Sequence, residues 1–429
     1  MSRAPAASVE HDRRVLGFWS LLALGINGIV GVGIFFVPSE LARALPGPAS
    51  ALAFALTALL LLPVAWTYGR LGSAYPEDGG PYVWAREAVG PRFAFGVGFV
   101  AYSSAVLSTA AVVSGLGQYL APELGFAGAG PRVVFQIVTA LLFSSVTLLG
   151  LRPSAWVWSG LTVLKLLPLL WLAASGARDV ARVAPEAWAL NGTGLWRAAL
   201  LAVFPMQGFE IVAVPGGEVR GSRRTVLGAS LGSLGFAALL YVLLQLACAL
   251  NLPELATSPA PIVEAGLRLT HGAGAPLFAA GANVSAIGIA FGMFAMTPRY
   301  LAALGTGELL GTALGRERRG VPVLSLLVTT LAVLLLVSVT SLSSLFVLSS
   351  LAVLLQYAVS ALALLRLAGR RERGLGPLDR ALAPLTLLSI LALARSAELA
   401  EVAVLAAILA VGLASLRLRR ALALRGDAR

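Results

Sequence analysis

Charged residues, cysteine, histidine and lysine are all scarce in this chain of 429 residues. Only 12% of the residues are charged, about half the share of a typical soluble domain, whereas 58% are hydrophobic. The single cysteine, Cys248, excludes a disulfide or a thiolate metal site within the chain, and His11 and His271 are too few for a metal centre. We therefore expect no metal and no cofactor, and a polytopic protein embedded in a lipid bilayer.

The few charges are mostly positive, with a formal net charge of +12 and a pI near 10.9. In a soluble protein this balance would suggest a nucleic-acid partner. Here the arginines are spread through short loops between apolar segments, so we expect no nucleic acid. The scarcity of clustered nucleophiles, acids and metal ligands also argues against a membrane-bound enzyme. A channel is disfavoured because no ring of charges is evident.

Twelve apolar segments are candidates for helices that cross a bilayer. They cover about residues 15–37, 49–69, 92–119, 132–151, 155–176, 196–217, 225–250, 276–304, 321–339, 342–367, 382–396 and 400–417. If the N-terminus is cytoplasmic, the inner connecting segments hold 24 of the 31 arginines, as the positive-inside rule requires. We therefore predict a plasma (inner) membrane protein with both termini in the cytoplasm.

The first segment has a weak point at its centre. Four glycines fall within the nine residues from Gly25 to Gly33, with Asn27 and β-branched residues among them. Glycine and β-branched residues are poor helix formers, and broken backbone at this depth is tolerated only inside protein or along a watery cavity. The segment therefore predicts either an interrupted helix at a ligand site or a small-residue face for close helix packing.

The sixth segment has a similar weak point. Two prolines, Pro205 and Pro215, three glycines and the carboxylate of Glu210 lie between Phe204 and Gly217. Each proline removes a backbone donor and clashes with the preceding turn. The first and sixth segments open two successive sets of five, and interrupted helices at matching positions are typical of transporters with inverted repeats and a midplane binding site.

Several motifs occur in a fixed order along the chain. They are Gly31-Val-Gly-Ile-Phe35, the loop from Tyr75-Pro-Glu-Asp-Gly-Gly-Pro-Tyr to Arg86-Glu-Ala-Val-Gly90, Gly208-Phe-Glu210 followed by Glu218-Val-Arg220, and Pro298-Arg-Tyr300. Together they resemble the amino acid–polyamine–organocation superfamily of amino acid permeases over roughly residues 15 to 370. Two positions depart from that pattern: Val32 stands where serine is common, and Val214-Pro-Gly-Gly217 precedes Glu218 where a second acid is usual.

The resemblance implies an all-α integral membrane fold of twelve transmembrane helices. Ten of them would form a 5+5 inverted repeat, as in the leucine transporter, with helices 1 and 6 broken. The expected ranges are a cytoplasmic tail at 1–14, a first repeat at 15–176, a second repeat at 196–367, two C-terminal helices at 382–417 and a cytoplasmic tail at 418–429.

A zwitterionic amino acid suits the two poles of an unwound helix. Backbone amides at the positive end would hold its carboxylate, and carbonyls at the negative end its ammonium. We expect the carboxylate on the amides near Val32, Gly33 and Ile34. The resemblance puts the ammonium on the carbonyls of Ile29 and of the Phe204 and Gln207 region beside Gly208, with the Phe204 ring either a lid or simple packing. Polar candidates for the remaining pocket wall are Tyr102, Ser103, Asn283 and Ser285.

Lys165 is the only lysine of the chain and lies in the middle of the fifth segment. An ammonium at this depth costs roughly 2.5–3.5 kcal/mol to insert, so it is retained for a reason or reaches an interface by snorkelling. Unlike arginine, lysine can release its proton. The resemblance implies that the amine replaces a sodium ion between helices 1, 5 and 8. We therefore interpret Lys165 as the proton-coupling residue or a fixed counter-charge.

Glu210 is the second candidate for proton coupling, because a buried carboxylate can hold and release a proton. Alternatively, it is a neutral strut that braces the broken sixth helix. Five charged residues on the predicted cytoplasmic side are candidates for gate ion pairs, although a solvated loop charge is the common alternative. They are Arg86, Glu87, Glu218, Arg220 and Arg299.

These features favour a secondary active permease that takes up an amino acid substrate with a proton by alternating access. No second carboxylate lies within the apolar segments around the expected site, which favours a neutral substrate. The alternatives are an amino acid exchanger and a carrier of polyamines or cationic amino acids. The functional unit is expected to be a monomer or a homodimer.

Overall fold

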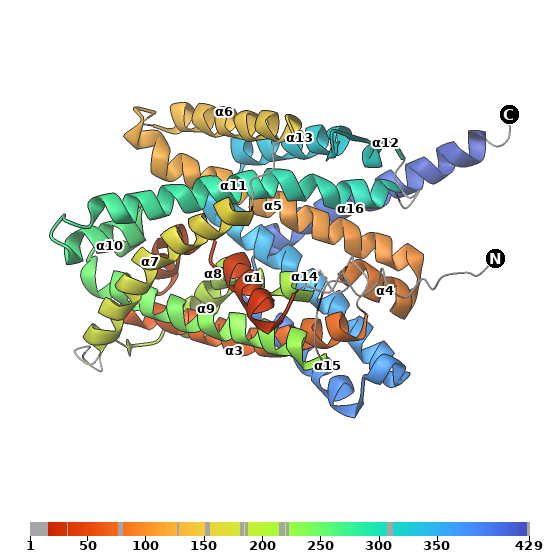
Figure 1. Ribbon diagram of the computed structural model, residues 1–429, viewed down its shortest axis with the longest axis horizontal. Helices are drawn as coiled ribbons and strands as arrows, with labels where there is room; N and C mark the ends of the chain where they lie inside the picture. Colours follow the sequence, from red (N-terminus) through yellow and green to blue (C-terminus); the bar gives the residue numbers. More distant parts are fainter. Residues whose placement is uncertain are drawn as a thin grey trace, which may run out of the picture.

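The computed structural model describes residues 16–31, 33–75, 80–126, 128–150, 155–180, 184, 188–213, 219, 223–306 and 312–426. These residues are mostly helical, and most of the long helices run along the long axis of the molecule (Figure 1). The first half contains α1 (Phe18–Ile29), α2 (Gly33–Ala44), α3 (Ala51–Ala74), α4 (Pro81–Val89), α5 (Pro91–Glu123), α6 (Ala129–Leu148) and α7 (Ala155–Asp179). The second half contains α8 (Gly192–Met206), α9 (Arg223–Asn251), α10 (Pro261–Leu269), α11 (Ala275–Thr306), α12 (Thr312–Gly315), the hairpin β1 (Glu317–Arg318) and β2 (Val321–Pro322), α13 (Val323–Val339), α14 (Leu342–Gly369), α15 (Pro377–Ala394) and α16 (Leu399–Gly426).

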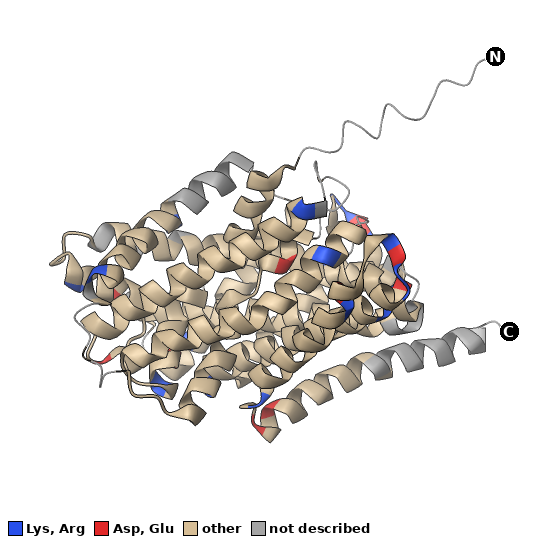
Figure 2. Cartoon of the chain, turned by 90° about the horizontal axis from the view of Figure 1, so that it is seen from below, with Lys and Arg blue, Asp and Glu red and all other residues tan. Residues whose placement is uncertain are grey.

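Seven of the described helices are long and apolar enough to cross a membrane, and the count is eight if α1 and α2 form one bent span. The seven are α3, α5, α6, α9, α11, α14 and α15. Charged side chains gather towards the two ends of the bundle and are sparse between them (Figure 2). The remaining predicted segments coincide with α7, α8, α13 and α16, so the described chain is a multi-pass membrane protein, and the count of twelve spans stays a prediction.

The first predicted interruption is confirmed. Helix α1 ends at Ile29, helix α2 begins at Gly33, and the two axes differ by 51°. The last regular bond of α1 runs from Val30 N–H to Ile26, and Gly31 N–H turns back to the carbonyl of Ile29. Val32 lies outside the described residues. The glycine-rich sequence therefore ends one helix and starts another within three residues.

The second predicted interruption is confirmed as well. Helix α8 ends at Met206, a turn follows at Gln207 and Gly208, and a short 3-10 helix, η5, covers Phe209–Ala213. Gly208 has a φ of 121°, a left-handed value that residues with a Cβ rarely adopt. Glycine at this position therefore allows the chain to change direction inside the bundle.

The two broken segments lie inside the bundle. Helix α1 packs against α9, α9 packs against both α3 and α7, and α7 also contacts α11. On the other side, α8 contacts α2, α3 and α14, and α14 packs on α5. In Figure 1, α1 lies in the middle of the molecule. The broken backbone therefore packs among other helices, with Ile29 and Val30 buried and Gly28 exposed.

Ion pairs attach the two C-terminal helices to the rest of the bundle. Arg70 of α3 makes a two-pronged contact with Asp379 of α15, at 2.7 Å for each oxygen. Arg197 of α8 does the same with Glu401 of α16, at 2.6 and 2.9 Å. Bidentate arginine–carboxylate pairs fix orientation as well as distance, so these contacts hold α15 and α16 in place.

Candidate functional site

The two helix interruptions touch each other through their glycines. A methyl group on Gly28 would lie 2.8 Å from the carbonyl oxygen of Gly208, and one on Gly208 would collide with the backbone of Gly28. A methyl group on Gly33 would lie 3.0 Å from the Cα of Pro205. Both ends of the first break are therefore in close contact with the second break, which makes this pair of breaks the candidate site.

Lys165 of α7 reaches the first break. Its ammonium donates to the carbonyl of Val30 at 2.6 Å and to Oδ1 of Asn27 at 2.7 Å, with the Asn27 carbonyl at 3.5 Å. The lysine is 5% exposed. Carbonyls at a helix end lack helical donors, and here a cation serves two acceptors beside the break. Lys165 therefore lies buried among protein oxygens and does not extend to an interface.

A tyrosine that the sequence did not single out also supports the first break. The hydroxyl of Tyr241 on α9 donates to the carbonyl of Ile29 at 2.8 Å, and the residue is fully buried. Asn27 was noted only as a helix breaker, yet its side chain is a partner of Lys165. A polar side chain inside an apolar segment is the one sequence signal that marks both residues. That signal does not reveal which helix the side chain faces.

The second break is supported from within its own segment. The Glu210 carboxylate accepts the backbone N–H of Gly208 at 2.7 Å. Glu210 therefore binds the turn before η5, and its role as a strut or as a proton carrier stays a prediction.

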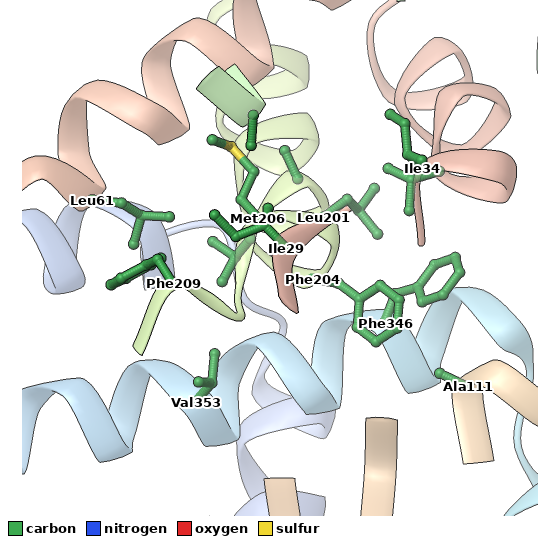
Figure 3. Close-up of a cluster of buried hydrophobic side chains, with 14 of the residues drawn as sticks. Ile29, Ile34, Leu61, Ala111, Leu201, Phe204, Met206, Phe209, Phe346 and Val353 are labelled. Carbon is green, nitrogen blue, oxygen red and sulfur yellow. The ribbon is translucent and has the colours of Figure 1, made fainter. Parts of the chain in front are cut away.

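Helices α8 and α14 face each other across the site in two matched pairs. The rings of Phe204 and Phe346 have centroids 4.5 Å apart, and Figure 3 shows them side by side within the buried apolar cluster. One turn further along each helix, Gln207 Nε2 lies 3.3 Å from Ser349 Oγ. Ser349 in turn bonds to Ser108 of α5 at 2.7 Å. This wall of the site is therefore aromatic at one level and polar but uncharged at the next.

The four polar candidates for the pocket wall fall into two groups. Tyr102 bonds to Thr329 of α13 at 3.2 Å and Ser103 to the carbonyl of Phe99 at 2.8 Å, so neither is linked to the breaks by these bonds. Within the described part of the chain, Asn283 Oδ1 and Ser285 Oγ are buried without a hydrogen-bond partner. Buried polar atoms are normally bonded, which makes these two the better candidates for ligand contacts.

Three of the expected gate residues, Arg86, Glu87 and Arg299, lie within the described part of the chain, and these three do not form one cluster. Arg86 and Glu87 pair with each other at 3.2 Å on α4, and the Glu87 carbonyl accepts from Arg370 at 3.4 Å. Arg299 of α11 instead lies 3.6 Å from Glu317 on β1. Glu218 and Arg220 lie outside the described residues. Their neighbour Val219 forms an isolated parallel bridge with Leu16, which joins the start of the first broken segment to the chain beyond the second.

A family model described as amino acid permease matches residues 16–413, which is nearly the whole chain. The chain belongs to the amino acid permease family. The resemblance seen in the sequence motifs is thereby confirmed.

Among the residues that the structure describes, no group of three histidines, cysteines or acids could hold a metal ion.

Curated relatives of this permease-family chain carry transporter names. An uncharacterized transporter of Mycobacterium tuberculosis is 32% identical over 60% of this chain and 58% of its own length. The branched-chain amino acid permease of Bacillus subtilis is 27% identical over 56% and 55% of the two chains. Cationic amino acid transporter 7 of Arabidopsis thaliana is 26% identical over 61% and 49%. The chain thus matches only about half of the length of these relatives.

Proposed function

We propose that this chain is a secondary active permease that carries a neutral amino acid across the membrane together with a proton. The observation that supports this most is the buried Lys165 ammonium on the oxygens of Val30 and Asn27, at the point where α1 ends. Oxygen acceptors of this kind also suit a sodium ion, but lysine can give up its charge by losing a proton. Loss of that proton would free the oxygens and loosen the break.

The substrate would lie between the two breaks. Helix α2 begins at Gly33, so the amides of Gly33 and Ile34, with that of Val32, would receive the carboxylate at a positive helix end. The carbonyls at the end of α8, near Phe204 and Gln207, would receive the ammonium. The Ile29 carbonyl already accepts from Tyr241 and Gly31, so it would serve the substrate only after one of these donors has moved.

The surroundings of the breaks favour an uncharged side chain. Glu210 is the single acid in the first and sixth apolar segments, and its carboxylate is engaged by Gly208 N–H. Phe204 and Phe346 form an apolar wall opposite α2. The relatives' names include both branched-chain and cationic amino acids. A carrier of cationic amino acids or polyamines, or an amino acid exchanger, is therefore the alternative.

The proposal includes the full membrane architecture expected from the sequence. It comprises twelve spans with a 5+5 inverted repeat, both termini in the cytoplasm, and a monomer or homodimer in the plasma membrane. The α1 and α8 segments would rock as a unit against α5, α11 and α14 around the central site. The glycine contact between the breaks and the Leu16–Val219 bridge support joint movement of the two broken segments.

Reconstituted vesicles with an imposed pH gradient test this function. Wild-type protein is expected to take up labelled branched-chain or small neutral amino acids and to move protons with them. Lys165→Ala should abolish the gradient-driven part of uptake, and Lys165→Arg, which keeps the charge but cannot release a proton, should do the same. Proton flux unaffected by Lys165→Ala would contradict the coupling. Rapid counterflow of trapped amino acid without any gradient would favour the exchanger.

A further inference from the structure

A small notch, separate from the two breaks, lies where three elements meet. The end of α6, the C-terminal part of α11 and the β1–β2 hairpin line it, with Phe294 and Pro298 from α11 and Val321 and Pro322 from the hairpin. Arg299 also lines the notch. The notch therefore has apolar walls and one guanidinium.

Arg299 is fixed at the notch with part of its side chain exposed. Nη2 donates to the carbonyl of Gly320 at 3.0 Å, Nη1 lies 3.6 Å from Glu317, and 41% of the side chain is exposed. A guanidinium has five N–H donors in a rigid fork that matches phosphate geometry. Two contacts on the hairpin thus orient Arg299 and leave its charge accessible to an anion.

The hairpin adds further positive charge beside Arg299. Arg316, Arg318 and Arg319 are exposed, and the acid among them in the sequence is Glu317. The hairpin is held against the end of α6, because a methyl group on Gly150 would lie 3.3 Å from the carbonyl of Arg319. The arginines are therefore kept beside the notch by backbone packing.

An exposed apolar surface leads away from the notch along two helices. Helix α13 starts directly after the hairpin, and Leu324, Leu327 and Leu331 are exposed along one of its faces. Helix α6 packs beside α13, as Figure 1 shows, and exposes Leu141, and Leu149 directly after its end is exposed as well. In a membrane-crossing helix pair such a surface faces lipid tails. The apolar helix faces match the acyl chains of an anionic phospholipid, and the clustered arginines at their end match its phosphate headgroup.

We propose that this notch binds the phosphate headgroup of an anionic phospholipid, such as phosphatidylglycerol, with its chains along α6 and α13. Basic pockets between transmembrane helices recognise anionic headgroups in this way, and each arginine near the surface contributes to the attraction. The site gives Arg299 a role in lipid binding at a place whose lining shares no residue with the two breaks.

Native mass spectrometry of the full-length protein with phosphatidylglycerol or phosphatidylcholine tests the site. Wild type should retain phosphatidylglycerol in preference to phosphatidylcholine. Arg299→Gln should weaken retention of phosphatidylglycerol about fivefold. The double change Arg318→Gln/Arg319→Gln should have a larger effect than Arg299→Gln, because each of the two arginines contributes about fivefold. Arg380→Gln, an exposed arginine of α15 outside the notch, is the matched control and should retain lipid like wild type.

Equal retention of phosphatidylglycerol by wild type and the notch variants would overturn the proposal, as would equal retention of the two lipids. Displacement of the lipid by millimolar inorganic phosphate would show that the site takes free phosphate instead. A photoactivatable phosphatidylglycerol provides a measurement on wild type alone, in case the variants fold poorly. Its adducts are expected within 141–149 and 320–331, and labelling confined to other regions would contradict the assignment.

Discussion

At the α1–α2 break the freed carbonyls are served by other helices, whereas at the α8–η5 break the freed amide is served locally. Lys165 and Tyr241 come from α7 and α9 to reach Val30 and Ile29. Gly208 N–H, in contrast, finds its acceptor two residues along the chain in Glu210. The first break therefore depends on the arrangement of the bundle, and the second carries its own cap. Relative movement of α7 or α9 would change the hydrogen bonds of the first break directly, whereas the bond between Gly208 and Glu210 lies within one segment.

The largest effect should follow from filling the contact between the breaks. Gly208→Ala puts a methyl group against Gly28 at a left-handed φ, which should destabilise the protein by about 3–5 kcal/mol. Thermal unfolding of the purified protein measures the change. Gly235→Ala is the matched control, because no neighbour lies within 4 Å of the added carbon and helix α9 favours alanine. An unfolding temperature equal to wild type in Gly208→Ala would disprove the close contact.

A smaller effect is expected from the long-range donor at the first break. Tyr241→Phe removes the bond to the Ile29 carbonyl and should cost about 1–2 kcal/mol of stability. It should also strengthen substrate binding about fivefold, because the Ile29 carbonyl then accepts the substrate ammonium without first releasing Tyr241.

Tyr102→Phe is the counterpart for this measurement, since it loses a bond to Thr329 that is not at the breaks. Its stability should fall by a similar amount while substrate affinity, measured by calorimetry or scintillation proximity, stays at the wild-type value. Equal affinities in the two variants would mean that Tyr241 has no special place in the site.

The smallest effect should come from the self-capped break. Glu210→Gln keeps an oxygen that can accept Gly208 N–H, so stability and the pH dependence of uptake should remain near wild type. Glu210→Ala removes the acceptor and should cost about 1 kcal/mol. If Glu210→Gln instead flattened the pH profile of uptake, Glu210 would belong to the proton path, and the second break would no longer be merely structural.

Local composition was enough to predict the interruptions and the buried amine. Glycine and proline weaken a helix wherever they occur, so the breaks near Gly31 and Gly208 followed from the residues themselves. The outer limits of the helices were less predictable, as α15 begins at Pro377, five residues before the expected segment. Helix ends depend on caps and neighbours as well as on hydropathy.

The wall of the site was only partly predictable. Tyr102 and Ser103 were chosen as polar residues in an apolar segment, yet their bonds go to α13 and to their own helix. Ser349, Ser108 and Phe346 lie at the wall and carried no distinguishing signal. A polar residue in an apolar helix has to face protein. Which neighbouring helix it faces depends on how its own helix is rotated about its axis, and packing sets that rotation.

The sequence by itself determined that the chain is an apolar, multi-helix member of the amino acid permease family with two weak helices and one buried lysine. These properties follow from residue types and their spacing, which act locally. Only the tertiary structure decided that the two breaks touch through Gly28 and Gly208, that Lys165 bonds to Val30 and Asn27, and that Arg299 faces a hairpin. These pairings join residues far apart in the chain, and the packing of whole helices selects them.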